Sequence, residues 1–221
     1  MSKTWSLKLD FTDKNHVAFD PSGLGDPVAS KTAWTPAKGG GANFRTQKLV
    51  KVSSYRIEFR ASIEAKIFYA IFLLAGLGMI IGISYYHFFQ ETLSFNAGTI
   101  IPLAMGIVFS AIGGLLLYFG TLPVVFDKMR GCFWKGFQPP NEMIDKTALK
   151  HYSEFSRIYA LQIISELCRC RNGSYYSYEL NLVLNDGQRI NITDHGNLQK
   201  LREDAKTLSE FLGKPLWDAI S

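Results

Sequence analysis

The sequence contains no lysine or arginine from residue 67 to residue 127, and the acidic residues of this stretch are Glu91 and Asp127. Charged residues make up only 19% of the chain and hydrophobic residues 47%, a balance that excludes an intrinsically disordered protein. With three cysteines, the chain also lacks the dense pairing of a small secreted domain held together by disulfides. These absences favour a protein that lies in a membrane.

Motifs of common catalytic and nucleotide-binding sites are missing as well. The chain has no G-x-S-x-G, no P-loop, no G-x-G-x-x-G and no H-E-x-x-H. Cys168 and Cys170, with Cys132 elsewhere, have no histidine at a zinc-type spacing. Asp194 and His195 are neighbours whose side chains point to opposite sides of a strand. We therefore expect a protein that is not an enzyme and has no catalytic residue, metal or cofactor.

The stretch without basic residues holds two runs long enough to cross a bilayer. Residues 67–86 read IFYAIFLLAGLGMIIGISYY, which as a helix rising about 1.5 Å per residue covers the roughly 30 Å of a hydrocarbon core. A second run begins at Thr99 and ends near Pro123, because proline interrupts a helix. The sequence predicts transmembrane helices over residues 67–86 and 99–122, joined by a short external loop over residues 87–98.

Basic residues flank these two runs on one side only. The joining segment has none, whereas a cluster precedes the first run and a smaller group follows the second. Positive residues remain on the cytoplasmic side of a membrane, so we expect an integral inner-membrane protein of a bacterium with both termini in the cytoplasm. Attraction to anionic lipid headgroups is a second explanation of the same residues. They are Arg45, Lys48, Lys51, Arg56, Arg60, Lys66, Lys128, Arg130 and Lys135.

Small residues recur at a spacing of four in both runs. Such a stripe lets two helix backbones approach closely. One interpretation is packing of the two helices against each other, and the alternative is a face that docks another membrane protein. The residues are Gly78 and Gly82 in the first run and Gly106, Ser110 and Gly114 in the second.

After the second run the pattern changes to short alternating strands separated by turn residues. Residues 124–135 indicate a hairpin that turns at Gly131, and Asp186-Gly187 separates two further strands. From Asn197 to Leu212 apolar residues follow helical spacing, with Gly213 placed to end the helix. We predict a membrane α-helical hairpin plus an α+β cytoplasmic domain over residues 123–221, with an antiparallel sheet closed by a C-terminal amphipathic helix.

The part before the first run has two sections of different character. Residues 1–44 contain many glycines and prolines and indicate a flexible tail. Residues 45–66 are a basic juxtamembrane segment, in which the alternation from Leu49 to Arg60 is that of one or two strands of the same sheet.

An antiparallel sheet with one C-terminal helix, placed after a transmembrane hairpin, resembles the pleckstrin-homology-like (PH-like) domains of bacterial membrane proteins. The order of parts also resembles the two-span photosystem I assembly protein family. Three segments carry this resemblance: GIVFSAIGGLLLYFG from Gly106, FDKMRGCFWKGF from Phe126, and ITDHGNLQKLREDAKTLSEFLGKPL from Ile192. The resemblance implies a membrane-anchored PH-like domain with a role in assembly, and it implies no catalytic residue.

Tyr175 and Tyr176 lie beside a turn at the end of a predicted strand, where exposed tyrosines either contact a partner or simply end the strand. Residues 127–221 hold 13 basic and 12 acidic residues, which gives no basis for nucleic-acid binding. No small-molecule substrate is evident. The first hypothesis is therefore an assembly factor or accessory subunit that docks a partner membrane complex and contacts membrane lipids. An anionic-lipid-sensing anchor is the second hypothesis, and a membrane-bound enzyme is the third.

Overall fold

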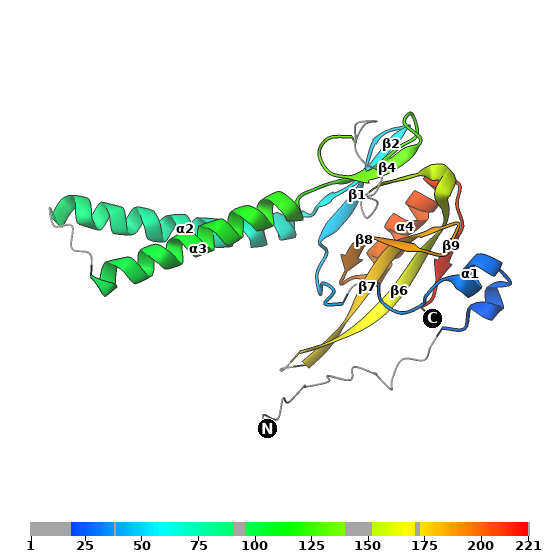
Figure 1. Cartoon of the computed structure of the whole chain (residues 1–221), viewed down its shortest axis with the longest axis horizontal. Helices are drawn as coiled ribbons and strands as arrows, with labels where there is room; N and C mark the ends of the chain where they lie inside the picture. Colours follow the sequence, from blue (N-terminus) through cyan, green and yellow to red (C-terminus); the bar gives the residue numbers. More distant parts are fainter. Residues whose placement is uncertain (1–18, 38, 91–95, 140–151, 171–172, 221) are drawn as a thin grey trace, which may run out of the picture.

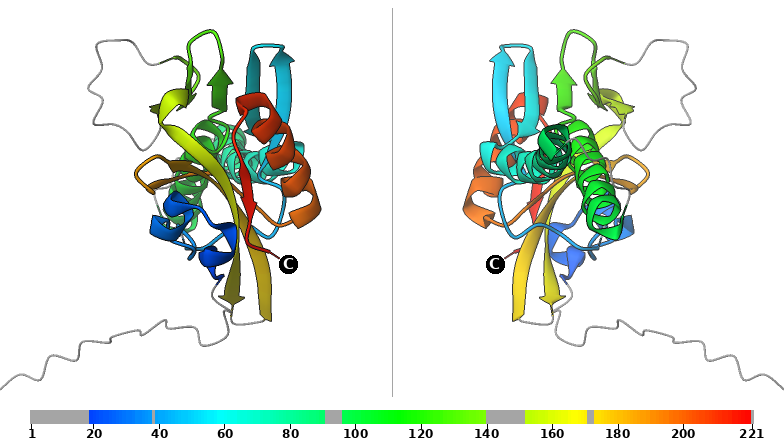
Figure 2. Two further views of the ribbon diagram at one scale, coloured as in Figure 1. Left: turned by 90° about the vertical axis from the view of Figure 1, so that its right-hand side faces the viewer. Right: turned by 90° about the vertical axis from the view of Figure 1, so that its left-hand side faces the viewer.

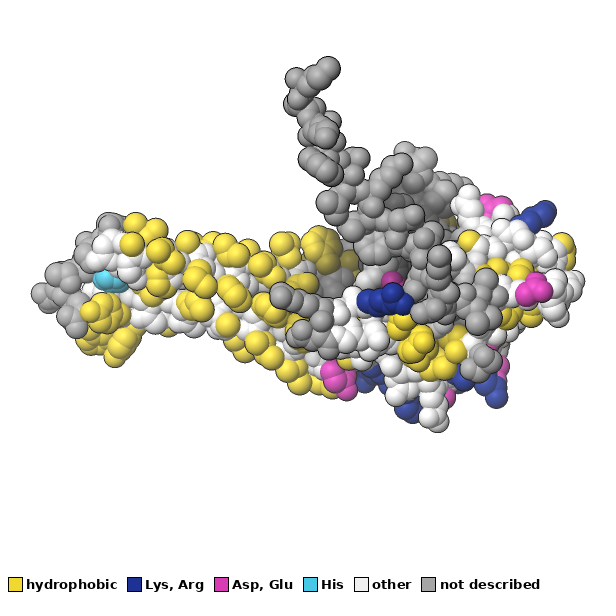
Figure 3. All heavy atoms as spheres, turned by 90° about the horizontal axis from the view of Figure 1, so that it is seen from below, with side chains coloured by type: hydrophobic (Ala, Val, Ile, Leu, Met, Phe, Trp, Pro, Cys, Tyr) yellow, Lys and Arg dark blue, Asp and Glu magenta, His cyan; other side chains and the backbone are white. Residues whose placement is uncertain are grey.

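A computed structural model describes residues 19–37, 39–90, 96–139, 152–170 and 173–220 of the chain. Two long helices project side by side from a domain built of strands and shorter helices (Figure 1). Apolar side chains cover the projecting helices, whereas charged side chains gather on the domain and at its junction with them (Figure 3). The molecule thus consists of an apolar helical hairpin and a domain whose surface carries most of the charged side chains.

The strands of the domain form two sheets, in which neighbouring strands are antiparallel except for the parallel pair of β6 and β9. The turns between β3 and β4 and between β7 and β8 each carry a glycine with positive φ, Gly131 at 65° and Gly187 at 84°, which confirms both predicted turns. The first sheet has the order β1 (Gln47–Ser53), β2 (Arg56–Ala61), β3 (Val124–Asp127), β4 (Cys132–Lys135) and β5 (Tyr152–Glu154). The second has the order β8 (Arg189–His195), β7 (Gly173–Leu184), β6 (Ile158–Cys170) and β9 (Leu216–Asp218), with the short helix η3 (Phe155–Arg157) before β6.

Helix α4 (Leu198–Leu212) closes the core between the two sheets. Leu201, Ala205 and Leu208 are fully buried on one face of the helix and pack with the inner residues of both sheets. The Asn197 side chain caps its start, and Gly213 ends it in the left-handed conformation at φ 65°. The predicted C-terminal amphipathic helix is confirmed. The single predicted sheet is instead two sheets, because β3 and β4 pair with β1, β2 and β5 and not with β6, β7 and β8.

Helices α2 (Ile63–Gln90) and α3 (Ala97–Gly120) are long and apolar enough to cross a membrane. Each begins earlier than the sequence predicts. Helix α2 begins at Ile63, two residues after the end of β2, and α3 begins at Ala97. Helix α3 ends before Pro123, as expected of a residue that cannot continue a helix. The two helices are therefore an insertion between β2 and β3, which are neighbours in one sheet. Residues 91–95 of the predicted loop lie outside the described residues.

The segment before β1 corrects the prediction of a flexible tail. Residues 19–37 and 39–44, here called the strap, contain the short helices η1 (Pro21–Leu24) and α1 (Pro27–Lys31). Asp20 and Asp26 cap these helices through hydrogen bonds to backbone N–H groups. The strap lies against the second sheet on the side opposite α4 (Figure 2). Residues 1–18 lie outside the described residues.

Candidate functional site

Small residues do form the contact between α2 and α3, but only part of the predicted set takes part. A Cβ atom added to Gly106 would lie 2.9 Å from a side-chain atom of Ile80 and 3.0 Å from the Gly76 carbonyl oxygen. A Cβ added to Gly76 would lie 2.4 Å from the Ser110 nitrogen. A Cβ added to Gly113, which was not among the predicted packing residues, would lie 2.3 Å from the Leu73 nitrogen. The helices can approach this closely because these positions carry little or no side chain.

Three predicted packing residues lie away from this contact. Gly78, Gly82 and Gly114 have no atom within 4 Å of an added Cβ. A straight α-helix turns about 100° per residue, so Gly78 faces almost opposite to Gly76. The hairpin interpretation is therefore wrong for these three glycines. Gly78 and Gly82 lie on another face of α2. Gly114 turns out of the contact because each step of four residues advances about 40° around the helix, whereas Gly113, seven residues after Gly106, stays on the contact face. The alternative, a face for another membrane protein, stays a prediction.

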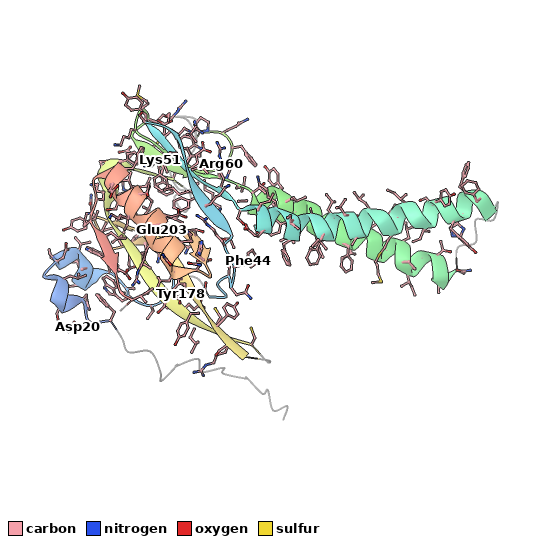
Figure 4. All side chains as sticks on the ribbon, turned by 180° about the vertical axis from the view of Figure 1, so that it is seen from behind. Asp20, Phe44, Lys51, Arg60, Tyr178 and Glu203 are labelled. Carbon is pink, nitrogen blue, oxygen red and sulfur yellow. The ribbon has the colours of Figure 1, made fainter. Side chains whose placement is uncertain are left out.

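The nine predicted basic residues are not gathered on one surface. Strand β2 runs toward α2, so Arg56 at its start lies about 20 Å of extended chain before the helix. Lys51 and Arg60 lie at opposite ends of the β1–β2 pair, and Lys51 is the farther of the two from the helices (Figure 4). The residues near the helices are Arg45, Lys48, Arg60, Lys66 and Lys135, and those at the far end are Lys51, Arg56, Lys128 and Arg130.

Three of these cations form ion pairs with carboxylates of described residues in the domain. Arg56 and Arg60 both bind the buried carboxylate of Glu58, at 2.7 and 2.6 Å. Arg45 binds Asp204 of α4 at 2.8 Å. Because Glu58 and Asp204 have little exposure, these ion pairs neutralise charge within the fold. Lys48 and Lys66, near the helices, form no ion pair with another described residue.

The second sheet carries an unusual row of polar residues on the side that faces the strap. Successive residues of a strand alternate between faces, so Ser177, Glu179 and Asn181 lie on the side opposite to core residues Leu180 and Leu182. All three are completely buried. Together with their neighbours on β6 and β8 they form the polar face, which consists of Gln162, Glu166, Ser177, Glu179, Asn181 and Arg189.

The polar face forms hydrogen bonds with the backbone of the described strap residues. At one end Arg189 Nη1 donates to the Thr35 carbonyl oxygen at 2.7 Å, and Gln162 Nε2 donates to that of Ala33 at 3.2 Å. Farther along the strap, Ala37 N–H donates to Glu179 Oε2 at 2.9 Å. The side chains thus supply donors to carbonyl groups at one end and acceptors to N–H groups beyond it.

At the far end of the polar face, both carboxylate oxygens of Glu166 accept hydrogen bonds from the strap. Gly40 N–H donates to its Oε1 at 3.0 Å and Gly41 N–H to its Oε2 at 3.2 Å. A Cβ on Gly41 would lie 2.1 Å from Ser177 Oγ, so only glycine fits there. Two buried atoms of the polar face, Ser177 Oγ and Asn181 Oδ1, have no hydrogen-bond partner among the described residues.

The two tyrosines predicted as partner contacts have different surroundings. Tyr175 Oη donates to the Gly41 carbonyl oxygen at 2.8 Å, so Tyr175 extends the polar face and holds the strap. Burial is the main cause that raises the pKa of Tyr175, so its hydroxyl stays protonated and a donor. Tyr176 is 54% exposed. A contact with a partner stays a prediction for both.

The strap is also anchored by apolar contacts before it reaches the polar face. Ala29, Ala160, Val183 and Trp217 form a small cluster on this side of the sheet, with Trp34 packed against it. The ring centroids of Trp34 and Trp217 lie 5.8 Å apart. This cluster holds residues up to 34, whereas the following residues are held by polar contacts.

His195 lies at the point where the strap passes into β1 and is completely buried. Its Nδ1 accepts a hydrogen bond from Asn197 N–H at 2.8 Å, which places the proton of the neutral ring on Nε2. Burial, aided by the positive charge of Arg45, lowers the pKa of His195 to about 4. Asp204 partners Arg45 here, and burial raises its pKa. His195 thus has a structural role at this junction.

Acidification should destabilise the domain through His195. Between pH 6.5 and 4 the unfolded chain binds a proton at this residue and the folded chain does not, so the stability present above pH 6.5 decreases as the pH falls. From pH 7 to pH 4.5 we expect a loss of about 2 to 3 kcal/mol from this group. Urea unfolding followed by tryptophan fluorescence measures it. His195→Asn, which retains an acceptor but does not titrate, should show a correspondingly smaller pH dependence, and an unchanged dependence would contradict the assignment.

The three cysteines are free thiols, with Cys132 and Cys168 buried and Cys170 exposed. Burial raises the pKa of both buried thiols. In the described part of the chain no three His, Cys, Asp or Glu residues lie close enough to hold a metal ion.

No protein-family model matches this chain, and comparisons with curated proteins and with solved structures find no similar protein.

Proposed function

We propose that this chain is an integral membrane protein whose α2–α3 hairpin crosses the bilayer twice. At about 1.5 Å per residue, helices of 28 and 24 residues are long enough for a hydrocarbon core of roughly 30 Å. Their outward side chains are apolar and exposed, as lipid-facing side chains are (Figure 3). The domain then rests directly on the bilayer, because β2 leads into α2 and α3 leads into β3.

The charge distribution supports a cytoplasmic position of the domain in a bacterial inner membrane. Lys48 and Lys66 lie near the start of the hairpin, while the segment between α2 and α3 has no lysine or arginine. Positive residues favour the cytoplasmic side. Two sheets closed by a C-terminal helix further support the proposal that this domain is PH-like.

The proposed role is that of an assembly factor or accessory subunit that docks a partner membrane complex. The observation that carries this proposal is the polar face, where side chains from three neighbouring strands bind the backbone of a bent, non-helical polypeptide segment. Such an arrangement is suited to binding protein chains. The proposal assigns no catalytic step, metal or cofactor to the domain.

An anionic-lipid-sensing anchor is the second candidate, favoured by Lys48 and Lys66 beside the helices. The ion pairs of Arg45, Arg56 and Arg60 reduce the positive charge available for lipid headgroups. Lipid attraction of this kind is electrostatic and is screened by salt.

Affinity purification of the full chain in mild detergent tests the two candidates. A protein partner that remains in stoichiometric amount at about 0.5 M salt supports docking, because screening at that salt removes contacts that are only electrostatic. A matched variant, Lys48→Gln with Lys66→Gln, should leave this partner bound. Recovery of lipid alone, lost in this variant and at high salt, would contradict docking and support the second candidate.

A further inference from the structure

We propose that the polar face is a docking site for a non-helical, glycine-containing segment of the partner protein, and that the strap occupies this site in the absence of the partner. The inference rests on the proposed docking function and names the chemistry of the segment that docks. The strap is in effect a ligand carried by the same chain.

The strap is recognised in a way that another segment can reproduce. Over residues 33–37 and 39–41, the hydrogen bonds that hold the strap to the polar face use carbonyl and N–H groups of the strap. The side chains of Thr35 and Ala37 are exposed and make no such contact. Any chain that follows the same bent, non-helical course has the same backbone groups, so the site selects for this conformation and for glycine at the positions of Gly40, whose φ is 84°, and Gly41.

The strap does not use the whole site. Ser177 Oγ and Asn181 Oδ1 are buried and have no hydrogen-bond partner among the described residues. A buried polar group without a partner loses its hydration and gains nothing in exchange. A segment that supplied hydrogen bonds to these atoms would therefore bind better than the strap does.

The part of the strap over the polar face can also open without unfolding the domain. Its apolar anchors, Ala29 and Trp34, lie before and at the start of this part, and residues 39 and 40 are exposed glycines without side chains to bury. Segments with few buried apolar contacts open locally at low free-energy cost. Because a tethered strap competes at high effective concentration, weakening the strap should raise the affinity for an external segment.

Gly41→Val provides the test, because it disturbs the strap and leaves every residue of the polar face unchanged. The added Cβ would lie 2.1 Å from Ser177 Oγ. The probe is a fluorescent synthetic peptide with the sequence of residues 31–44, titrated into the purified full chain in detergent and followed by fluorescence anisotropy. We expect the peptide to bind the Gly41→Val chain at least about tenfold more tightly than it binds the natural chain.

Two controls make the result specific to the polar face. A peptide that itself carries Gly41→Val should not bind, and Glu166→Gln in the Gly41→Val chain should weaken binding of the natural peptide about tenfold, since Glu166 accepts two of the hydrogen bonds. Equal binding of the two peptides, or no binding of either, would overturn the inference.

Hydrogen exchange of the natural chain gives a second measurement that needs no variant. The N–H groups of Ala37, Gly40 and Gly41 should exchange at least about 100-fold faster than those of Leu180 and Leu182, because they open locally. Equal protection would show that the strap opens only when the domain unfolds, and would overturn the inference.

Neither measurement involves the partner. Failure of peptide binding, while a partner still purifies with the chain at high salt, would leave the docking function intact and reject the polar face as its site. Peptide binding without any partner would instead support the site and contradict the docking function.

Discussion

Gly113→Leu should separate the two apolar helices and strongly reduce the amount of folded protein in the membrane. A Cβ at this position would lie 2.3 Å from the backbone nitrogen of Leu73 and 2.6 Å from its Cα. Backbone atoms cannot rotate away as a side chain can, so the helices must move apart and lose their packing along the contact. We expect a cost of at least about 3 kcal/mol for the hairpin.

Gly114→Leu is the matched control, because it makes the same chemical change one residue away. An added Cβ at Gly114 meets no atom within 4 Å, so this variant should behave as the natural chain does. Gly76→Leu and Gly78→Leu form a second pair of the same kind on α2. The free energy of hairpin dissociation in bicelles, measured by steric trapping, distinguishes them. Equal losses at Gly113 and Gly114 would contradict the helix contact described here.

Trp34→Ala should release the strap from the second sheet. The Trp34 ring packs near Phe19 and Trp217, with centroid distances of 4.3 and 5.8 Å, and its Nε1 donates to the Ala29 carbonyl oxygen at 2.9 Å. The ring is only half-buried, so truncation should cost about 2 kcal/mol, below the cost at a fully buried site. This corresponds to a roughly 30-fold increase in strap opening.

Limited proteolysis measures this opening, because Lys31 lies within the strap and is a site for trypsin. Cleavage after Lys31 should accelerate in Trp34→Ala by about the same factor. Trp34→Phe retains most of the apolar contact and loses the hydrogen bond, so it should show an intermediate rate. If cleavage in Trp34→Ala remained as slow as in the natural chain, Trp34 would not anchor the strap.

The elements that could be predicted are those whose signals are local. The helix from Leu198 to Leu212 has its cap at Asn197 and its end at Gly213 within the sequence itself, and Gly131 and Gly187 mark their own turns. The two apolar helices follow from composition and length. Each of these signals is contained in a few consecutive residues.

The strap could not be predicted, because its order comes from contacts with residues far away in the sequence. Its glycines and prolines are typical of a linker, and the need for glycine at position 41 comes from contact with the distant residues Ser177 and Glu166. The alternation of Glu179 and Asn181 with core leucines is visible in β7 but indicates a solvent-exposed face. Only the structure shows that this face is covered.

The helix contact and the basic cluster were partly predicted for a related reason. A spacing of four residues drifts about 40° around a helix at each step and does not say which face meets the other helix, so Gly106 and Ser110 were predicted together with Gly78, Gly82 and Gly114. Similarly, Arg56 and Arg60 are close in the sequence but lie at opposite ends of β2.

Labelling with a membrane-impermeant maleimide in intact cells tests most directly whether the hairpin spans the membrane with the domain inside. Cys170 is an exposed natural thiol of the domain, and Ser94→Cys in a Cys170→Ser chain places a thiol between α2 and α3. We predict that position 94 reacts in intact cells and that Cys170 reacts only after the cells are permeabilised. Labelling of Cys170 in intact cells, or of position 94 only after permeabilisation, would contradict the account.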